Sequence, residues 1–352
     1  MKLKSAFRIL NEIKYVKSVL KQYGHILARG RYYQHNCFRA LSLDTPFIRE
    51  KSQLYFNKGN SGKIMLRIIK VLRRVGYFTN RNKKSTGEYD GFYIANNYNK
   101  VREVKLFSFK NDRILTVCVG REEAKKQLAE YKQFGGAYNM PRVQKDERFE
   151  TSFEISMVKL KKYESESLAF ENICASTATY NSKTEELQRI TVKELINFSY
   201  DDEQNVYLKK IADKIDKKLL EIKIPLCTQH GDLSKDNLIY GDCDGKTDFW
   251  WIDWEHVEKR VFFYDLFFYM INPALYGDKA PFETYINGEA DEVLQKFFAH
   301  FGTEFEKDKR FDYFLIFTLP FLKERVCPIG GLPILKRYYA LIEELANSVK
   351  TV

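Results

Sequence analysis

The feature that most limits what this chain of 352 residues can fold into is a polar run followed by a short hairpin. The run, His230 to Ile239, has the sequence HGDLSKDNLI, and Trp251-Ile252-Asp253-Trp254-Glu255 follows after a turn. The apolar residues of the two segments predict two strands joined by that turn, with a loop in front of the first strand. The second strand is expected over residues 248–253, so that it ends at an aspartate.

The residue types in this pattern suit phosphoryl transfer. That reaction needs an acceptor hydroxyl held in line and metal ions that neutralise the triphosphate. One carboxylate must lie at the acceptor, and other hard oxygen ligands must face the metal. Asp232, with Asn237 five residues later, meets the first requirement, and Asp253 meets the second. A single His-Gly-Asp would otherwise be read as a turn with a capping aspartate.

The two motifs, His-Gly-Asp-Leu-x-x-x-Asn-Leu and Ile-Asp-Trp-Glu, resemble the catalytic loop and metal-binding motif of the aminoglycoside phosphotransferases and choline/ethanolamine kinases. These enzymes are relatives of the protein kinases. The resemblance implies that Asp232 is the catalytic aspartate, which orients the acceptor hydroxyl and receives its proton, and that His230 braces the loop. It also implies that Asn237 and Asp253 bind Mg²⁺. The phosphoryl donor is expected to be ATP, with GTP as an open alternative.

A further short segment extends the resemblance to residues 230–266. Phe263-Tyr264-Asp265-Leu266 is similar to the helix start that follows in the family. In the family this aspartate helps to hold the catalytic loop, which implies that Asp265 does so here.

The family resemblance is weaker in the region that would bind the nucleotide. In the family, a lysine on a strand binds the phosphates and is held by a glutamate on the next helix. In this chain, Glu130 in the helix predicted over 121–134 is expected at the position of that glutamate. The preceding strand, 113–119, has no interior lysine. Lys105 on the neighbouring strand is a replacement, expected opposite Cys118 across a turn at Asn111-Asp112, and Arg113 is a second candidate. The alternative is that Lys105 is solvated and the chain is a weak or inactive kinase.

Other residues have two interpretations each. Met157 lies within a predicted strand, 152–160, where the adenine-contacting hinge is expected, and it is therefore expected near the adenine. Glu255 and His256 lie just after Asp253, where they either contact the acceptor or cap the next segment. The three tryptophans around Asp253 could form a cation–π cage, although a place in the core is favoured over the cage. They are Trp250, Trp251 and Trp254.

Positive charge is concentrated at the start of the chain. Residues 1–85 contain 20 Lys or Arg and three acids, a net charge of +17. Amphipathic helices are predicted at 2–21 and after 59–62. They are interpreted either as a solvated basic face that packs on an acidic C-terminal lobe or as a peripheral contact with anionic lipid, to which each cation contributes about 1 kcal/mol. No nucleic-acid-binding motif is present, and no nucleic-acid partner is expected.

The predicted fold is α+β and bilobal, like that of the protein kinases. Residues 1–85 are expected to form a basic helical N-terminal extension, 86–160 a strand-rich nucleotide-binding lobe, and 161–352 a helical lobe with the catalytic loop and acceptor site. The six cysteines are scattered, and no signal-peptide core or transmembrane segment is evident. The expected location is cytoplasmic, with peripheral contact at the inner face of the membrane.

The predicted function is ATP- and Mg²⁺-dependent phosphorylation of a hydroxyl on a small molecule or sugar. The preferred acceptor is a cell-envelope glycan of the lipopolysaccharide or capsule type, or its precursor, because a basic surface would bring a lipid-linked acceptor to the site. Two alternatives remain open at this point. One is a choline or ethanolamine kinase, and the other is a pseudokinase that acts as a binding module.

Overall fold

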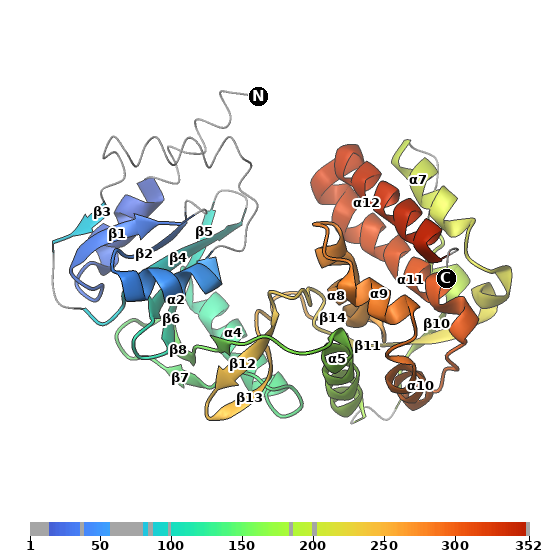
Figure 1. Cartoon of the computed structure of the whole chain (residues 1–352), viewed down its shortest axis with the longest axis horizontal. Helices are drawn as coiled ribbons and strands as arrows, with labels where there is room; N and C mark the ends of the chain where they lie inside the picture. Colours follow the sequence, from blue (N-terminus) through green and yellow to red (C-terminus); the bar gives the residue numbers. More distant parts are fainter. Residues whose placement is uncertain are drawn as a thin grey trace. The chain divides into compact units, whose positions relative to one another are not determined.

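The chain forms two compact units, each with its own core (Figure 1). The computed structural model describes residues 14–35, 39–56, 80–83, 87–97, 100–182, 186–198 and 203–349. The strand-rich unit contains Met1–Lys132, Pro141–Leu160 and Gly241–Thr247, and the helical unit contains Gln133–Met140, Lys161–Tyr240 and Asp248–Val352. The predicted combination of a strand-rich part and a mainly helical part is confirmed. The helix expected after residues 59–62 lies outside the described residues.

The strand-rich unit is built on one antiparallel sheet, which in the described ranges has eight strands in the order β3-β1-β2-β4-β5-β6-β8-β7. In the described part of the chain, the helix at residues 14–23 and the helices α2 and α4 belong to the same unit. The elements are β1 (Gly30–Gln34), β2 (Ala40–Leu43), α2 (Pro46–Phe56), β3 (Asn80–Asn82), β4 (Gly91–Asn97), β5 (Lys100–Ser108), β6 (Arg113–Cys118), α4 (Arg121–Phe134), β7 (Val143–Lys145) and β8 (Ser152–Ser156).

The predicted helical extension over residues 1–85 is wrong in part, because β1, β2 and β3 lie in this region and belong to the same sheet as β4 to β8. Pairing between distant strands is decided by tertiary contacts that local periodicity does not report. Residues 14–23 are helical, which agrees with the helix predicted over 2–21, and residues 2–13 of that prediction lie outside the described residues. This helix buries Val16, Val19 and Tyr23 in the unit's core, so its apolar face is used inside the protein.

The hairpin of β5 and β6 was predicted correctly, but its register was not. Lys105 pairs with Thr116, whereas the sequence predicted Cys118. The reason is that the loop occupies residues 109–112 and is closed by Ser108 and Arg113, with Asp112 in a left-handed conformation. The loop centre is therefore one residue earlier than expected. A register change of two residues leaves Lys105 on the same face of the sheet.

The helical unit contains most of the remaining elements. Helices pack around an aromatic core, and one three-stranded sheet has the order β10-β11-β14. A further sheet has the order β13-β12-β9, and its residues are divided between the two units. Strand β13 ends at Trp251, so Asp253 lies after the strand rather than at its last position. The strands are β9 (Lys159–Leu160), β10 (Arg189–Thr191), β11 (Lys223–Gln229), β12 (Leu238–Cys243), β13 (Lys246–Trp251) and β14 (Glu258–Val261).

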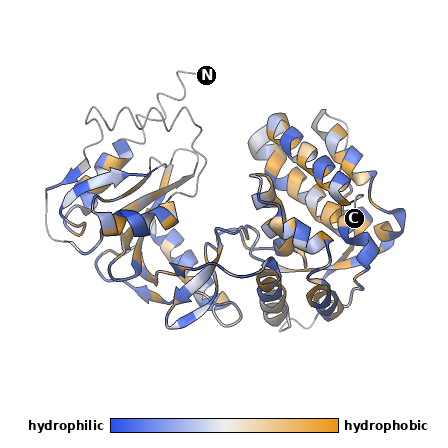
Figure 2. Cartoon of the chain, viewed as in Figure 1, coloured by the Kyte–Doolittle hydropathy of each residue, from blue (hydrophilic) through white to orange (hydrophobic). Residues whose placement is uncertain are grey.

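The helices of this unit bury long runs of apolar residues. All residues of α8 except two near its end are buried, and α11 is buried from Tyr313 to Phe321. Figure 2 shows hydrophobic and hydrophilic residues interleaved along α12. None of the described helices is both long enough and apolar enough to cross a membrane. The helices are α5 (Glu166–Asn181), α6 (Val192–Leu195), α7 (Glu203–Ala212), α8 (Tyr264–Ala274), α9 (Ala280–Ile286), α10 (Asp291–His300), α11 (Arg310–Phe321) and α12 (Cys327–Val349), with short 3₁₀ turns η1 (Lys217–Glu221) and η2 (Lys307–Lys309) and the π-helical turn η3 (Leu322–Val326).

Candidate active site

The loop at residues 230–238 is held at its start by Asp265 in the first turn of α8. The two carboxylate oxygens of Asp265 accept hydrogen bonds from the backbone N–H groups of His230, at 2.6 Å, and Gly231, at 2.8 Å. Asp265 is 1% exposed, and burial raises its pKa to about 7 although the two N–H groups oppose this change. Because hydrogen bonds to a buried carboxylate are strong, Asp265 fixes the direction in which the loop leaves β11.

His230 braces the loop from inside. Its ring is fully buried, and Nε2 lies 2.8 Å from the carbonyl oxygen of Ile252, just before Asp253. The other nitrogen, Nδ1, accepts from the backbone N–H of Asp232 at 3.3 Å. Burial lowers the pKa of His230 to about 4, so the ring is neutral at pH 7 and Nε2 donates to the carbonyl. One neutral side chain therefore ties the loop to the segment after β13.

Only glycine fits at the second position of the loop. Gly231 has a φ of +79°, and a Cβ built there would lie 2.2 Å from the carbonyl oxygen of His256. Both the backbone conformation and the close approach exclude a side chain. The absence of a side chain allows the chain after Asp253 to pass directly against the loop.

Asp232 and Asn237 face each other across the loop. The Asn237 amide nitrogen donates to the Asp232 carbonyl oxygen at 2.8 Å and lies 3.4 Å from its carboxylate Oδ2. The Asp232 side chain is 34% exposed, so it can reach a bound molecule. Burial raises its pKa to about 6, and the neighbouring Asp253 charge raises it further, while Arg325 and Asn237 lower it. The carboxylate is ionised at pH 7 but close enough to its pKa to exchange a proton.

Arg325 is a site residue that the sequence analysis did not find. It lies in η3, where its guanidinium Nη2 is 3.5 Å from Asp232 Oδ1 and Nη1 donates to the carbonyl oxygen of Gly231. Its guanidinium also lies over the ring of Phe268, 5.5 Å from the ring centroid. No local motif marks this arginine, because it is more than 90 residues from the loop and reaches it through the packing of η3 and α8.

Asn237 and Asp253 provide oxygen atoms that a hard cation could use. Asn237 donates through its nitrogen, and its Oδ1 accepts no hydrogen bond from the described residues. The half-buried Asp253 carboxylate makes no hydrogen bond or ion pair within the described part of the chain, and its backbone has a φ of +64°. Amide and carboxylate oxygens are the ligands that Mg²⁺ prefers. Within the described ranges, no group of three or more His, Cys, Asp and Glu side chains could hold a metal.

A second charged cluster fixes the middle of the loop. Lys235 Nζ lies 2.5 Å from Glu166 Oε1 at the start of α5 and 2.8 Å from Asp278 Oδ2 in the turn after α8. The hydroxyls of Tyr163 and Tyr269 both contact Glu166. These bonds raise the pKa of Lys235 against the effect of burial, so the ammonium remains charged. The sequence analysis did not single out this lysine, and its acidic partners are distant in sequence.

The strand-rich unit contains the other predicted residues. Lys105 Nζ on β5 lies 3.1 Å from Glu103 Oε1 on the same strand, and the amide of Gln127 on α4 donates to Glu103 at 2.9 Å. Glu130, the expected partner of the lysine, lies 3.8 Å from Lys126 on its own helix. Glu103 is 1% exposed, and the charge of Lys105 lowers its pKa despite burial. Glu103 was missed because nothing in its local sequence indicates burial.

The remaining predicted residues are also located. Met157 is 3% exposed and belongs to an apolar cluster of the strand-rich unit. Glu255 and His256 are neighbours on the segment after Asp253, with Glu255 Oε1 and His256 Nε2 3.9 Å apart. The three tryptophans are at most 5% exposed, and Trp254 stacks on Phe134 with ring centroids 4.3 Å apart. The preferred interpretation of the tryptophans as core residues is confirmed.

Comparison with known proteins gives only distant likenesses. No protein-family model matches the chain, and no curated protein matches it. A choline kinase, LicA, from Streptococcus pneumoniae is 14% identical, covers 81% of this chain and 100% of its own, and has a TM-score of 0.40. The aminoglycoside 2'-phosphotransferase-IIIa has 14% identity, coverages of 82% and 100%, and a TM-score of 0.40. A glucosamine kinase has 13% identity, coverages of 74% and 83%, and a TM-score of 0.42.

Proposed function

We propose that this protein transfers the γ-phosphoryl group of a nucleoside triphosphate, ATP as the first choice, to a hydroxyl of a small molecule or sugar. The observation that carries the proposal is the environment of Asp232. It is a partly exposed carboxylate with a pKa near neutrality, on a loop whose backbone is fixed by Asp265 and His230. A base held in this way can orient a hydroxyl and accept its proton as the phosphorus–oxygen bond forms.

The other loop residues have supporting roles in this proposal. Arg325 and Asn237 keep Asp232 ionised and limit the directions in which its carboxylate can point. Asn237 Oδ1 and the Asp253 carboxylate would hold Mg²⁺, which when bound neutralises the charge on the nucleotide phosphates. In the strand-rich unit, Lys105 would contact the phosphates, with the buried Glu103 fixing its ammonium. Glu130 and Met157 are also proposed to lie near the bound nucleotide.

The acceptor is proposed to be a cell-envelope glycan or its precursor. The support is the net charge of +17 in residues 1–85, which suits an anionic surface. In the described part of this region, the apolar side of helix 14–23 is buried and Lys14, Lys17 and Lys21 are exposed. Contact with a membrane would therefore be electrostatic. Liposomes containing anionic lipid should retain the protein at low salt and release it at high salt, whereas zwitterionic liposomes should not retain it.

The test of phosphoryl transfer compares two aspartates of the same loop. Wild type, Asp232→Asn and Asp236→Asn are incubated with Mg²⁺ and γ-labelled ATP, together with choline, free sugars or a purified envelope glycan. Asp232→Asn should lower the rate by roughly 10²–10⁴-fold, because a general base is lost. Asp236 is exposed, so Asp236→Asn should retain activity within a few fold.

The same experiment separates the alternatives. Transfer to choline alone would favour a choline kinase, and transfer to the glycan would support the preferred acceptor. The missing lysine in β6 favours the pseudokinase as a second candidate. If wild type transfers nothing to any acceptor and both variants bind nucleotide as wild type does, the proposed function is wrong and a binding module remains.

A further inference from the structure

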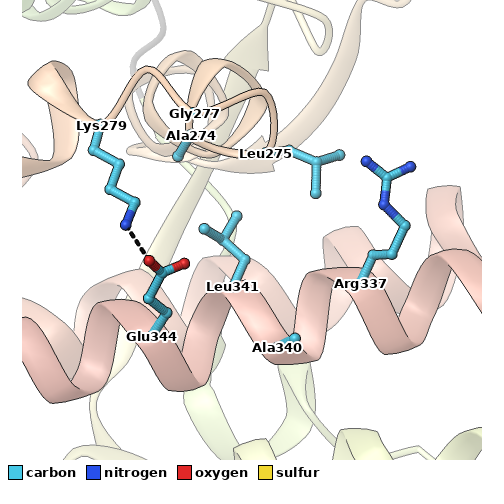
Figure 3. A pocket seen from close by; sticks show the side chains of 8 residues that line it. All are labelled: Ala274, Leu275, Gly277, Lys279, Arg337, Ala340, Leu341 and Glu344. Atoms are coloured by element: carbon cyan, nitrogen blue, oxygen red, sulfur yellow. Dashed lines mark hydrogen bonds and ion pairs between the residues drawn. The ribbon is translucent and has the colours of Figure 1, made fainter. Parts of the chain in front are cut away.

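A groove lies between the turn after α8 and one side of α12 in the helical unit. It has a volume of about 510 Å³, which is within the size range of small-molecule sites. None of the residues proposed above for catalysis or metal binding lines it. Figure 3 shows its lining side chains, which are Ala274, Leu275, Gly277, Lys279, Arg337, Ala340, Leu341 and Glu344.

The walls of the groove are apolar in the middle and charged at both ends. Leu341 extends from α12 toward the opposite wall, and Leu275 extends from that wall toward Arg337 (Figure 3). Lys279 and Glu344 lie at one end of the groove and Arg337 at the other. The methyl side chain of Ala340 leaves the α12 side open between these ends. A ligand that fills the groove would therefore contact aliphatic carbon in its middle and a charged group at its end.

The charged side chains at the two ends of the groove differ in whether they have an ion-pair partner. Lys279 forms an ion pair with Glu344, so these two charges neutralise each other. Arg337 is exposed and has no ion-pair or hydrogen-bond partner among the described residues. Its guanidinium has five N–H donors in a planar arrangement that suits a phosphate or carboxylate. The net charge of the lining is positive, and an anionic group is its complement.

The turn that forms one wall has a defined conformation. Gly277 has a φ of +95°, and the N–H groups of Asp278 and Gly277 donate to the carbonyl oxygens of Pro273 and Ala274 at 3.1 and 3.0 Å. This is the Schellman arrangement at a helix C-terminus, in which glycine supplies the left-handed residue. The turn is thus preformed, and its Asp278 contacts Lys235 of the 230–238 loop.

We propose that this groove binds a small anionic amphiphile, a phosphate or carboxylate joined to a short aliphatic segment. The aliphatic segment packs between Leu275 and Leu341, and the anionic group pairs with Arg337. The site is separate from the phosphoryl-transfer residues, although one ion pair connects its wall to their loop. The proposal does not depend on turnover, because it concerns binding at residues that the proposed reaction does not use.

The test is a calorimetric titration of the full chain with octyl phosphate below its micelle-forming concentration, with octanol and octyltrimethylammonium as comparison ligands. Wild type should bind octyl phosphate more tightly than either comparison ligand. Arg337→Gln should weaken this binding roughly tenfold, as expected for the loss of one charged hydrogen bond. Lys336→Gln is the matched control on the same helix, and its dissociation constant should equal that of wild type.

Filling the groove is the second test. Ala340 is exposed on α12, so Ala340→Trp and Ala340→Leu should fold normally, as checked by circular dichroism, and should reduce binding of octyl phosphate. Tryptophan should reduce it more than leucine, because it occupies more of the groove. Equal binding by Arg337→Gln and Lys336→Gln, equal affinity for octyltrimethylammonium, or unchanged binding in both Ala340 variants would overturn the proposal.

Discussion

The charge of Asp232 depends on opposing effects from its neighbours. Burial and Asp253 disfavour its ionised form, whereas Arg325 and Asn237 favour it. The guanidinium is 3.5 Å from the carboxylate, longer than a direct hydrogen bond, but it also donates to the backbone of Gly231. Arg325 therefore acts on both the charge and the position of Asp232.

Replacing Arg325 should lower kcat more than it changes nucleotide affinity. We expect Arg325→Ala to lower kcat roughly tenfold to hundredfold, since a charged hydrogen bond contributes about 1.5–3 kcal/mol. Steady-state kinetics and a separate nucleotide titration measure the two quantities. Arg325→Lys, or guanidinium added to Arg325→Ala, should restore part of kcat. A variant that loses nucleotide binding and kcat equally would contradict this role.

A second buried carboxylate, Asp90 in the strand-rich unit, should make stability depend on pH. It is 1% exposed, one of its oxygens accepts from the backbone N–H of Phe109 at 2.9 Å, and the other has no partner within the described chain. Burial raises the pKa of Asp90 to about 6. Asp90 therefore holds its proton more tightly in the folded state than in the unfolded state. The free energy that this contributes to folding is fully present below pH 3.8 and is lost as the pH rises past about 6.

The corresponding experiment measures unfolding between pH 4 and 7. Wild type should lose on the order of 3 kcal/mol from this group across that range, and Asp90→Asn should not show this contribution. Asp213→Asn, at an exposed aspartate, is the control and should follow wild type. Identical pH profiles for wild type and Asp90→Asn would show that Asp90 is not responsible.

At the scale of helices and strands, the predictions from the sequence were most accurate where they depended on neighbouring residues in the sequence. The helix α4 has the predicted bounds, because acidic residues mark its start and Gly135-Gly136 follow its end. The β5–β6 hairpin was also predicted, yet its register differed by two residues since loop geometry, not strand composition, decides register. The 230–238 loop was found from its motif, whereas its contact with Arg325 had no local signal.

The position of Lys105 on β5 leads to a prediction about nucleotide binding. Lys105 is paired with a buried glutamate, while Lys110 lies exposed in the turn that follows the strand. If Lys105 contacts the phosphates, Lys105→Met should raise the nucleotide Kd roughly tenfold, and Lys110→Met should leave it unchanged. Titration with a fluorescent nucleotide measures both constants. Equal values for the two variants would mean that the phosphate contact comes from elsewhere.

At the scale of the whole molecule, each unit has its own hydrophobic cluster. Leu106 is fully buried in the strand-rich unit, and Phe317 is fully buried in the helical unit. Leu106→Ala should cost about 2–5 kcal/mol and Phe317→Ala about 3–5 kcal/mol, because each leaves a cavity. Hydrogen exchange should show the loss of protection mainly in the unit that carries the change. Equal loss in both units for either variant would indicate that they unfold together.

The sequence predicted two structural classes in one chain but not the extent of the sheet. Residues 1–85 looked helical and basic, and the pairing of β1, β2 and β3 depends on contacts with strands far along the chain. The candidate site shows the same dependence on distant contacts. Its acidic and amide residues could be predicted from motif and family resemblance, and these are Asp232, Asn237, Asp253 and Asp265. Their cationic neighbours, Arg325 and Lys235, are brought to the loop only by tertiary packing.

The strands β1, β2 and β3, which the sequence did not predict, also affect where the chain could be truncated. Within the described residues, the sheet ends at β3 and β7, each three residues long, and short polar edges such as β3 resist pairing with other chains. A chain that began at residue 86, the boundary expected from the sequence, would lack β1 to β3. It would expose the edge of β4, whose seven residues include Phe92 and Ile94. Such a fragment should aggregate during expression, although it would retain every residue proposed for catalysis.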